Sequence, residues 1–426
     1  MYKFFIYHIF IIAIIFICNI KVKVMKKISI VTTTINIPLF LNDIVKNIRI
    51  KKSQKIFDIS IIVIADKKTP KEAKQFCLNL KKKSKVNILY FDIGFQDKFF
   101  KKRYPSLYKL FPYNDAIRKL LGLIYVLNDL PDKIILIDDD NYCNSKQNFL
   151  GDFDIVGKNY NGQTVYNKNC WPNIYKSFIE QNNIPIYPRG YPWKYRNSDS
   201  FKFKKKKVRN QKIIANCGFI LNDPDIDAVS RLFFKIKTIG VKNKNYFVIS
   251  KNNFFPLNDQ NLCISKEYIA LYYKPLSAGR NSDIWSSYLL SKVSSSHNEL
   301  ISYGRPHLKQ FRNIHDYWND YELEKKHNIS TDLFVDILKT INLNKKNTRY
   351  KNFVKLCNDG IKIAKDMIKR KIKKKIKKKI TVRHYQNITG QKAIERNVES
   401  LRYIIEYFRE YNIWLRLIKK YNFNKF

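Results

Sequence analysis

The sequence contains no C-x-x-C pair, and its seven cysteines are odd in number and scattered over 426 residues. This spacing indicates neither a zinc site nor a disulfide framework, so a reducing cytosol is the simpler environment. Acidic residues are also scarce, with 35 Asp and Glu against 81 Lys and Arg, which gives a net charge of +46. Such a charge predicts polyanionic partners. Because Lys, Asn, Ile, Phe and Tyr, whose codons are A/T-rich, are all abundant, local clusters of charge carry more weight than the total.

No small-x-small cleavage site follows the apolar run of residues 4–20, so the sequence does not predict a cleaved signal peptide. Two interpretations of residues 1–24 remain open. The first is a membrane anchor, because the run is near the minimum length for a span and the lysines after it favour the cytosolic side. The second is a start codon assigned too early, with Met25 as the natural beginning. Both predict a cytosolic protein, either peripheral to the membrane or held by one N-terminal span.

Strand and helix patterns alternate through the first 140 residues. Runs rich in β-branched residues predict strands at 27–33, 58–65, 86–91 and 133–137, and helical spacing predicts helices at 39–48, 70–83 and 115–127. This alternation predicts an α/β fold with a mostly parallel, doubly wound (Rossmann-like) sheet flanked by helices.

Three carboxylates follow the strand predicted at residues 133–137. Open α/β sheets bind their ligands at the carboxyl ends of parallel strands, where Asp138, Asp139 and Asp140 lie. In an extended chain residues i and i+2 point the same way, so Asp138 and Asp140 are predicted to share one Mn²⁺ or Mg²⁺ ion. The alternative is a solvated acidic turn after a core strand.

The chain changes character twice after the triplet. Short strands and aromatic-rich loops follow, with residues 202–207 predicted as an exposed loop or insertion, 213–221 as a strand and 285–293 as a helix. We therefore predict an N-terminal segment at 1–24, a catalytic domain at 25–330, and a basic helical extension at 331–426.

The extension contains a basic helix, residues 361–380, in which isoleucines lie among many lysines. One apolar stripe inside a cationic face predicts a helix on an anionic membrane surface. Two alternatives remain: a solvated helix whose stripe packs on the domain, and a nucleic-acid-binding segment. The segment has no interleaved aromatics, so no specific nucleic acid is predicted.

Five further segments accompany the triplet in a fixed order. They are Ala65–Pro70, Pro112–Lys119, Tyr187–Pro192, Leu221–Ala228 and Gly279–Trp285. Together they resemble the GT-A glycosyltransferase-like group that includes the STELLO proteins and the reversibly glycosylated polypeptides of plants (UDP-arabinopyranose mutases). The resemblance covers roughly residues 27–316. Two departures, Asn141-Tyr142-Cys143 after the triplet and the lysine run at 202–207, put the sugar pocket in doubt more than the metal site.

The resemblance implies roles for several residues of the nucleotide and metal sites. Thr33 and Asp66 would lie near the base and ribose, with a turn residue as the alternative for Asp66. Arg118 and Lys119 would neutralise the diphosphate or contact the base, the alternative being a solvated basic pair on a helix. Asp139 would join them in binding the nucleotide sugar. GT-A enzymes often use a late histidine as a metal ligand, which singles out His307; a surface histidine is the alternative.

Two residues are candidates for catalysis. Asp283 resembles the family's acidic residue before a helix and would act as general base on the acceptor hydroxyl, or instead serve as a helix N-cap. Arg189 lies in the segment R-G-Y-P and would contact sugar or phosphate, the alternative being a rigid proline-bounded loop.

The sequence therefore predicts a metal-dependent glycosyltransferase with a nucleotide-diphosphate sugar donor, most simply a UDP-sugar. Its acceptor would be a glycan, a lipid-linked group or a protein, as in surface glycan or glycoconjugate synthesis. A nucleotide-sugar pyranose/furanose mutase, and a non-enzymatic basic protein associated with membrane or RNA, are the alternatives.

Overall fold

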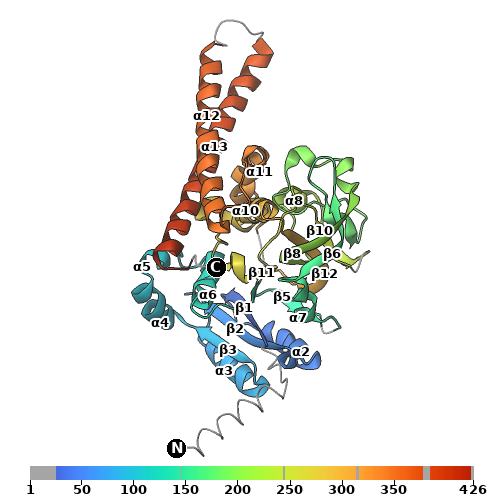
Figure 1. Ribbon diagram of the computed structural model, residues 1–426, viewed down its shortest axis with the longest axis vertical. Coiled ribbons are helices and arrows are strands. Elements are labelled where there is room, and N and C mark those ends of the chain that lie inside the picture. Colours follow the sequence, from blue (N-terminus) through green and yellow to red (C-terminus); the bar gives the residue numbers. More distant parts are fainter. Residues whose placement is uncertain (1–24, 145, 243–244, 313–315, 378–383, 424–426) are drawn as a thin grey trace, which may run out of the picture.

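The computed structural model describes residues 25–144, 146–242, 245–312, 316–377 and 384–423 (Figure 1). Side chains at 306–307, 371–377 and 384–394 also lie outside this description. The apolar segment 1–24, on which the anchor interpretation depends, is not among the described residues. Within them, no helix combines the length and the apolar character needed to cross a membrane.

The N-terminal part of the sheet is parallel. Strands β1 (Lys26–Thr34), β2 (Phe57–Ala65), β3 (Asn87–Phe91) and β4 (Lys133–Ile137) lie in the order β3-β2-β1-β4. Alternate residues of β4 enter two separate cores, Ile134 and Leu136 on one face and Ile135 and Ile137 on the other. A strand apolar on both faces requires cover on both sides. Helices α2 (Leu41–Ile50), α3 (Glu72–Ser84) and α6 (Lys119–Val126) belong to these covering layers.

The rest of the ten-stranded sheet is mixed. Strand β11 (Asn261–Ser265) pairs antiparallel with β4 and with β8 (Lys204–Leu221). Beyond β8 the order continues through β6 (Asn159–Tyr166), β10 (Phe247–Ile249), β12 (Leu300–Gln310) and β5 (Asn141–Cys143). The pairing of β12 with β5 sets Gln310 opposite Asn141, next to the acidic triplet. Side chains contributed late in the sequence thereby reach the end of β4.

One expectation for this half of the sheet is wrong. Residues 204–207 do not form a loop, because they begin β8 and pair antiparallel with β6. Their side chains are exposed, as predicted. Backbone hydrogen bonds to β6 hold this stretch in the sheet, and lysine, with low strand propensity, gives no local signal of it.

The remaining short elements connect these strands. They are α4 (Ile93–Gln96), α5 (Pro105–Tyr108), α7 (Phe149–Asp152), α8 (Ala228–Phe233), α9 (Lys266–Ile269), β7 (Phe178–Glu180) and β9 (Thr238–Val241).

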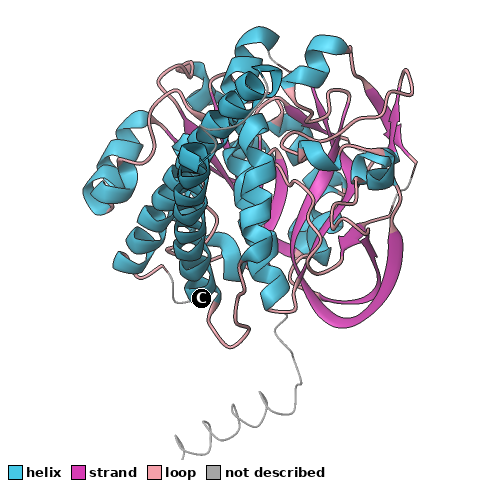
Figure 2. Cartoon of the chain, turned by 90° about the horizontal axis from the view of Figure 1, so that it is seen from above, coloured by secondary structure: helices cyan, strands magenta, loops and turns pink. Residues whose placement is uncertain are grey.

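Four longer helices complete the fold. They are α10 (Ser282–Ser296), α11 (Tyr317–Thr340), α12 (Arg349–Lys377) and α13 (His384–Lys420). Helices α12 and α13 run side by side and project beyond the sheet (Figure 1), and Figure 2 shows them end-on against other helices. The ring of Trp285 in α10 stacks on that of Phe334 in α11, with the ring centres 4.2 Å apart. It also contacts Tyr407 of α13, with the ring centres 5.2 Å apart. The extension therefore shares a core with the helices that cover the sheet. The α/β class, with a parallel sheet between helices and a helical C-terminal extension, is confirmed.

The apolar stripe of the basic helix 361–380 is partly accounted for by this packing. Ile361, Met367 and Ile368 are partly buried against the protein's own core, while Lys362, Lys365 and Lys369 are exposed. The isoleucines at 372, 376 and 380 lie outside the described side chains. In the described part of this helix, therefore, lysines and not isoleucines are free to face a partner.

Buried His327 predicts acid sensitivity of the helical extension. It is 3% exposed, hydrogen-bonds Tyr403 Oη through Nε2, and packs edge-on against Trp285. Burial, followed by repulsion from Arg189, lowers its pKa from 6.5 to about 3. Below about pH 6.5 this histidine is therefore protonated in the unfolded chain but stays neutral in the folded chain. The free energy of unfolding falls as the pH drops, by at most about 1.4 kcal/mol per pH unit.

We expect His327→Gln to flatten this dependence in urea unfolding curves recorded between about pH 4 and pH 7. His297→Gln is the matched comparison: burial also lowers the pKa of half-buried His297, so this variant should flatten the dependence less than His327→Gln. A variant at 327 with the same pH slope as the unaltered protein would contradict the assignment.

Candidate functional site

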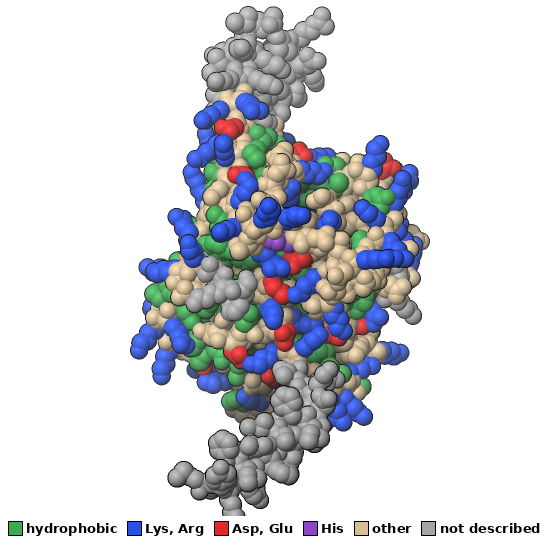
Figure 3. Space-filling view, in the orientation of Figure 1, with side chains coloured by type: hydrophobic (Ala, Val, Ile, Leu, Met, Phe, Trp, Pro, Cys, Tyr) green, Lys and Arg blue, Asp and Glu red, His purple; other side chains and the backbone are tan. Residues whose placement is uncertain are grey.

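The acidic triplet opens onto a cavity of about 450 Å³ at the carboxyl end of β4. Asp138 and Asp140 line it, together with residues from the loops on either side of β11 and before α10. Gln310 at the end of β12 and Arg312 just after it complete this wall. Figure 3 shows acidic side chains grouped near the middle of this face, with Lys and Arg beside them. The site is thus a charged cavity of mixed sign at the sheet edge where α/β proteins bind ligands.

The three carboxylates of the triplet have different surroundings. Asp138, whose side chain is 29% exposed, forms an ion pair with Lys119. Asp140 accepts a hydrogen bond from Gln310 Nε2 at 2.9 Å through Oδ2, and burial, then the charge of Asp138, raises its pKa to about 6. Asp139 turns toward β1 and accepts from Thr34 Oγ1 at 2.8 Å. The first and third members therefore meet at the cavity, and the second does not line it.

The chemistry of this pair fits a hard divalent cation. Asp140 Oδ1 is buried and has no hydrogen-bond partner among the described atoms. Two carboxylates suit a Mg²⁺ or Mn²⁺ ion that takes its other ligands from water and substrate phosphates. Within the described part of the chain, no group of three or more His, Cys, Asp and Glu side chains is arranged to hold a metal. The side chain of His307, the predicted third ligand, lies outside the described residues.

Lys119 joins the triplet to a second carboxylate. Its side chain is fully buried, its Nζ pairs with Asp138, and it lies 3.6 Å from Asp259 Oδ1. Asp259 also pairs with Lys274 Nζ at 2.7 Å. Burial alone would raise the pKa of Asp259, but Lys119 and Lys274 outweigh it and lower that pKa to about 2. Burial likewise opposes the charge on Lys119, but Asp138 and Asp259 raise its pKa. Asp138, Lys119, Asp259 and Lys274 thus form one alternating chain of charges, of which all but Lys119 line the cavity.

The two predicted catalytic residues both line the cavity and contact each other. Arg189, 6% exposed, donates from Nε and Nη2 to Asp225 at 2.8 and 3.0 Å and from Nη1 and Nη2 to Asp283 at 3.2 and 3.1 Å. Asp283 also accepts from the backbone N–H of Asp259 at 3.3 Å. Burial raises the pKa of Asp283 against the opposing effect of Arg189. The guanidinium therefore fixes the orientation of both carboxylates.

The N-cap interpretation of Asp283 is wrong by two residues. Helix α10 begins at Ser282, and its N-cap residue is Asn281, so Asp283 lies in the first turn. A carboxylate in the first turn is favoured by the helix dipole. Its side chain points into the cavity wall and contacts Arg189.

The other predicted residues lie outside the cavity lining. Thr33 Oγ1 donates to the backbone oxygen of Ile64 at 3.0 Å. Asp66, 4% exposed, accepts from the N–H of Asn114 at 2.8 Å. Arg118 is fully buried, donates to the Phe111 oxygen at 2.8 Å, and has its guanidinium 4.2 Å from the ring centre of Tyr113. The structure thus brings Asp138, Asp140, Arg189 and Asp283 together around one cavity, with Lys119 next to Asp138. The roles of all the predicted site residues stay predictions.

Several lining residues had no predicted role. They are Asp225, Asp259, Lys274, Arg280, Gln310 and Arg312. Asp225 and Arg280 occur within two of the ordered segments, so that signal was present. Asp259 and Lys274 reach the site only because β11 lies antiparallel beside β4, a tertiary pairing that no local pattern encodes.

Comparisons with known proteins return only distant likenesses. No protein-family model and no curated protein matches the chain. Among solved structures, glucosyl-3-phosphoglycerate synthase of Mycobacterium tuberculosis is similar with a TM-score of 0.35 and 10% identity, over 72% of this chain and 80% of that one. The same enzyme in complex with phosphoglyceric acid gives a TM-score of 0.34 and 10% identity, over 72% and 79%. At these values the likeness carries neither activity nor substrate to this chain.

Proposed function

We propose that this protein is a metal-dependent glycosyltransferase that binds a nucleotide-diphosphate sugar, most simply a UDP-sugar, and transfers the sugar to an acceptor. The observation that carries the proposal is the meeting of Asp138 and Asp140 with Arg189 and Asp283 around one cavity. These residues come from the triplet and from two of the five segments whose order resembles the GT-A glycosyltransferase-like group. Their position at the carboxyl end of β4 supports a nucleotide site.

A divalent cation held by Asp138 and Asp140 would stabilise the negative charge that grows on the leaving diphosphate. Neighbouring side chains hold the carboxylates of Asp138 and Asp140 in place. Gln310 donates to Asp140, and Arg312 Nη2 donates to Gln310 at 3.2 Å. Lys119 holds Asp138 from behind. Lys274 and Arg280 also line the cavity. Lys274 is paired there with Asp259, and Arg280 with Asp320 and Glu324.

On the acceptor side, Asp283 is the proposed general base and Arg189 the residue that orients it. The raised pKa of Asp283 moves this carboxylate toward the range in which a base accepts a proton efficiently. The acceptor would be a glycan, a lipid-linked group or a protein. Attachment to an anionic membrane through the exposed lysines of the basic helix 361–380 would suit glycoconjugate synthesis at the cytosolic face.

The test is a donor panel. Purified protein is titrated calorimetrically with UDP-sugars, with and without Mn²⁺, and products are separated by anion-exchange chromatography. We expect Mn²⁺-dependent binding of one donor and release of free UDP. An isomeric nucleotide sugar without free UDP would identify a mutase instead. Binding that ignores the metal, or no binding across the panel, would contradict the proposal.

A further inference from the structure

A groove between α12 and α13 carries two arginines that have no assigned role. A cavity of about 490 Å³ is lined by Tyr350, Val354 and Asn358 of α12 and by Arg409, Asn412, Ile413, Leu415 and Arg416 of α13. The lining residues of α12 are four apart, so they form one face of that helix. The groove lies far along the chain from the triplet and shares no lining residue with the cavity described above.

The arginines are free to bind an anion. Among the described residues no Asp or Glu side chain forms an ion pair with Arg409 or Arg416, and both are exposed. They are seven residues apart, two turns of one helix face, with Ile413 between them. Lys420 continues the same face one turn further. From Arg409 to Lys420 this face carries no acidic residue.

The floor between the arginines is apolar and fixed. Val354 and Leu415 form it, Ile413 is 38% exposed at its rim, and Tyr350 Oη donates to the Leu415 oxygen at 3.2 Å. Asn412 and Asn358 bridge the helices at 3.0 Å. A ligand that matches this surface has an anionic head of phosphate type, which two guanidinium forks bind well, and an apolar body.

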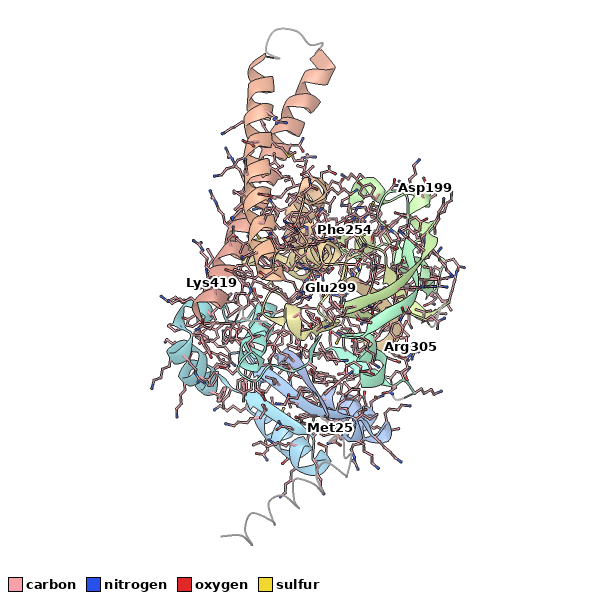
Figure 4. The ribbon with its side chains drawn as sticks, viewed as in Figure 1. Met25, Asp199, Phe254, Glu299, Arg305 and Lys419 are labelled. Carbon is pink, nitrogen blue, oxygen red and sulfur yellow. The ribbon has the colours of Figure 1, made fainter. Side chains whose placement is uncertain are left out.

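The groove belongs to a larger basic edge. Tyr421, just after α13, contacts Tyr104, with the ring centres 5.2 Å apart. This contact brings the exposed side chains of Lys101, Lys102 and Arg103 near the end of α13. Figure 3 shows Lys and Arg side chains along this edge, from the hairpin down to α4 and α5, and Figure 4 marks Lys419 there. Charge spread over an edge of the molecule is complementary to a sheet of anionic headgroups.

We propose that the groove formed by Arg409, Arg416 and the apolar floor between them binds the phosphate head of an anionic phospholipid at a membrane surface. The contact adds a defined site to the membrane attachment proposed above and does not depend on sugar transfer. The groove lies where α12 begins and α13 ends, so it can be tested separately from the far end of α12.

The test is cosedimentation of the full chain with vesicles of phosphatidylcholine containing phosphatidylserine. We expect Arg409→Gln/Arg416→Gln to weaken binding about tenfold or more, since each cation at an anionic surface contributes on the order of a fivefold change. Lys82→Gln/Lys83→Gln on α3, which lies beyond β3 and away from α12 and α13 in Figure 1, removes equal charge and should change binding little. Arg409→Lys/Arg416→Lys should fall between, because lysine keeps the charge without the fork.

Four outcomes would overturn the proposal. If the α3 control lost as much vesicle binding as the arginine variant, attraction would depend on total charge and not on a defined site. If all variants bound vesicles equally, attachment would depend on other residues. If millimolar inorganic phosphate reduced binding to the phosphatidylserine vesicles but not to neutral vesicles, the groove would be a site for free phosphate. Failure of the unaltered protein to bind vesicles would remove membrane attachment itself and leave the donor panel unaffected.

Discussion

Replacement of Arg189 by methionine is expected to lower the free energy of unfolding by about 3–5 kcal/mol. Asp225 and Asp283 are 3% and 4% exposed, and Arg189 donates two hydrogen bonds to each. Removal of the guanidinium leaves two buried carboxylates close together without this cation. Urea unfolding followed by circular dichroism at neutral pH measures the loss.

Two further variants separate this ion cluster from a general effect of removing arginine. Arg209→Met removes an exposed arginine of β8 and should change stability by less than about 0.5 kcal/mol. Asp225→Asn added to Arg189→Met should restore part of the loss, because it removes one unpaired charge. The defect of Arg189→Met should also shrink at acidic pH, where the carboxylates take up protons. A loss below about 1 kcal/mol, typical of an exposed pair, would contradict this account.

Local patterns were sufficient for the parallel half of the sheet. The strands at 27–33, 58–65, 86–91 and 133–137 correspond to β1, β2, β3 and β4. Strands β1, β2 and β4 are rich in β-branched residues and buried on both faces, a pattern typical of a parallel sheet, whereas β3 lies at the edge and is only partly buried. The triplet could be placed for the same reason, since it directly follows β4. The helix at 285–293 lies within α10, which is buried along most of its length.

Contacts between distant segments were not predictable in the same way. The sequence shows that Arg118 and Lys119 are adjacent, but not that Lys119 reaches Asp138 while Arg118 is enclosed by Phe111 and Tyr113. Adjacent residues on a helix point about 100° apart, so one of the two can face the site while its neighbour faces a core. Asp259 shows the same limit, because its place depends on the antiparallel pairing of β11.

The triplet itself gives the clearest separation of function from stability. Asp140→Asn is expected to reduce sugar transfer by at least about 100-fold, because the variant removes one of two anionic ligands proposed for the cation. Stability should stay the same or rise by about 1 kcal/mol. Burial and the neighbouring charge of Asp138 raise the pKa of Asp140 to about 6, so the ionised carboxylate is unfavourable in the folded protein, and asparagine keeps the shape without the charge.

Binding of Mn²⁺, followed by the electron paramagnetic resonance signal of the free ion, supplies a readout that is independent of turnover. Asp140→Asn should weaken it, whereas Asp129→Asn, at an exposed carboxylate paired with Lys27, should alter neither metal binding nor transfer. If the Asp140 variant were as active as the unaltered protein, the carboxylates would not form a metal site. If it lost activity together with its fold, Asp140 would be a structural residue whose hydrogen bond from Gln310 matters more than its charge. A ligand role predicts that the Asp140→Asn variant loses activity while it stays at least as stable as the unaltered protein. A buried charge that costs stability is retained where its chemistry is needed.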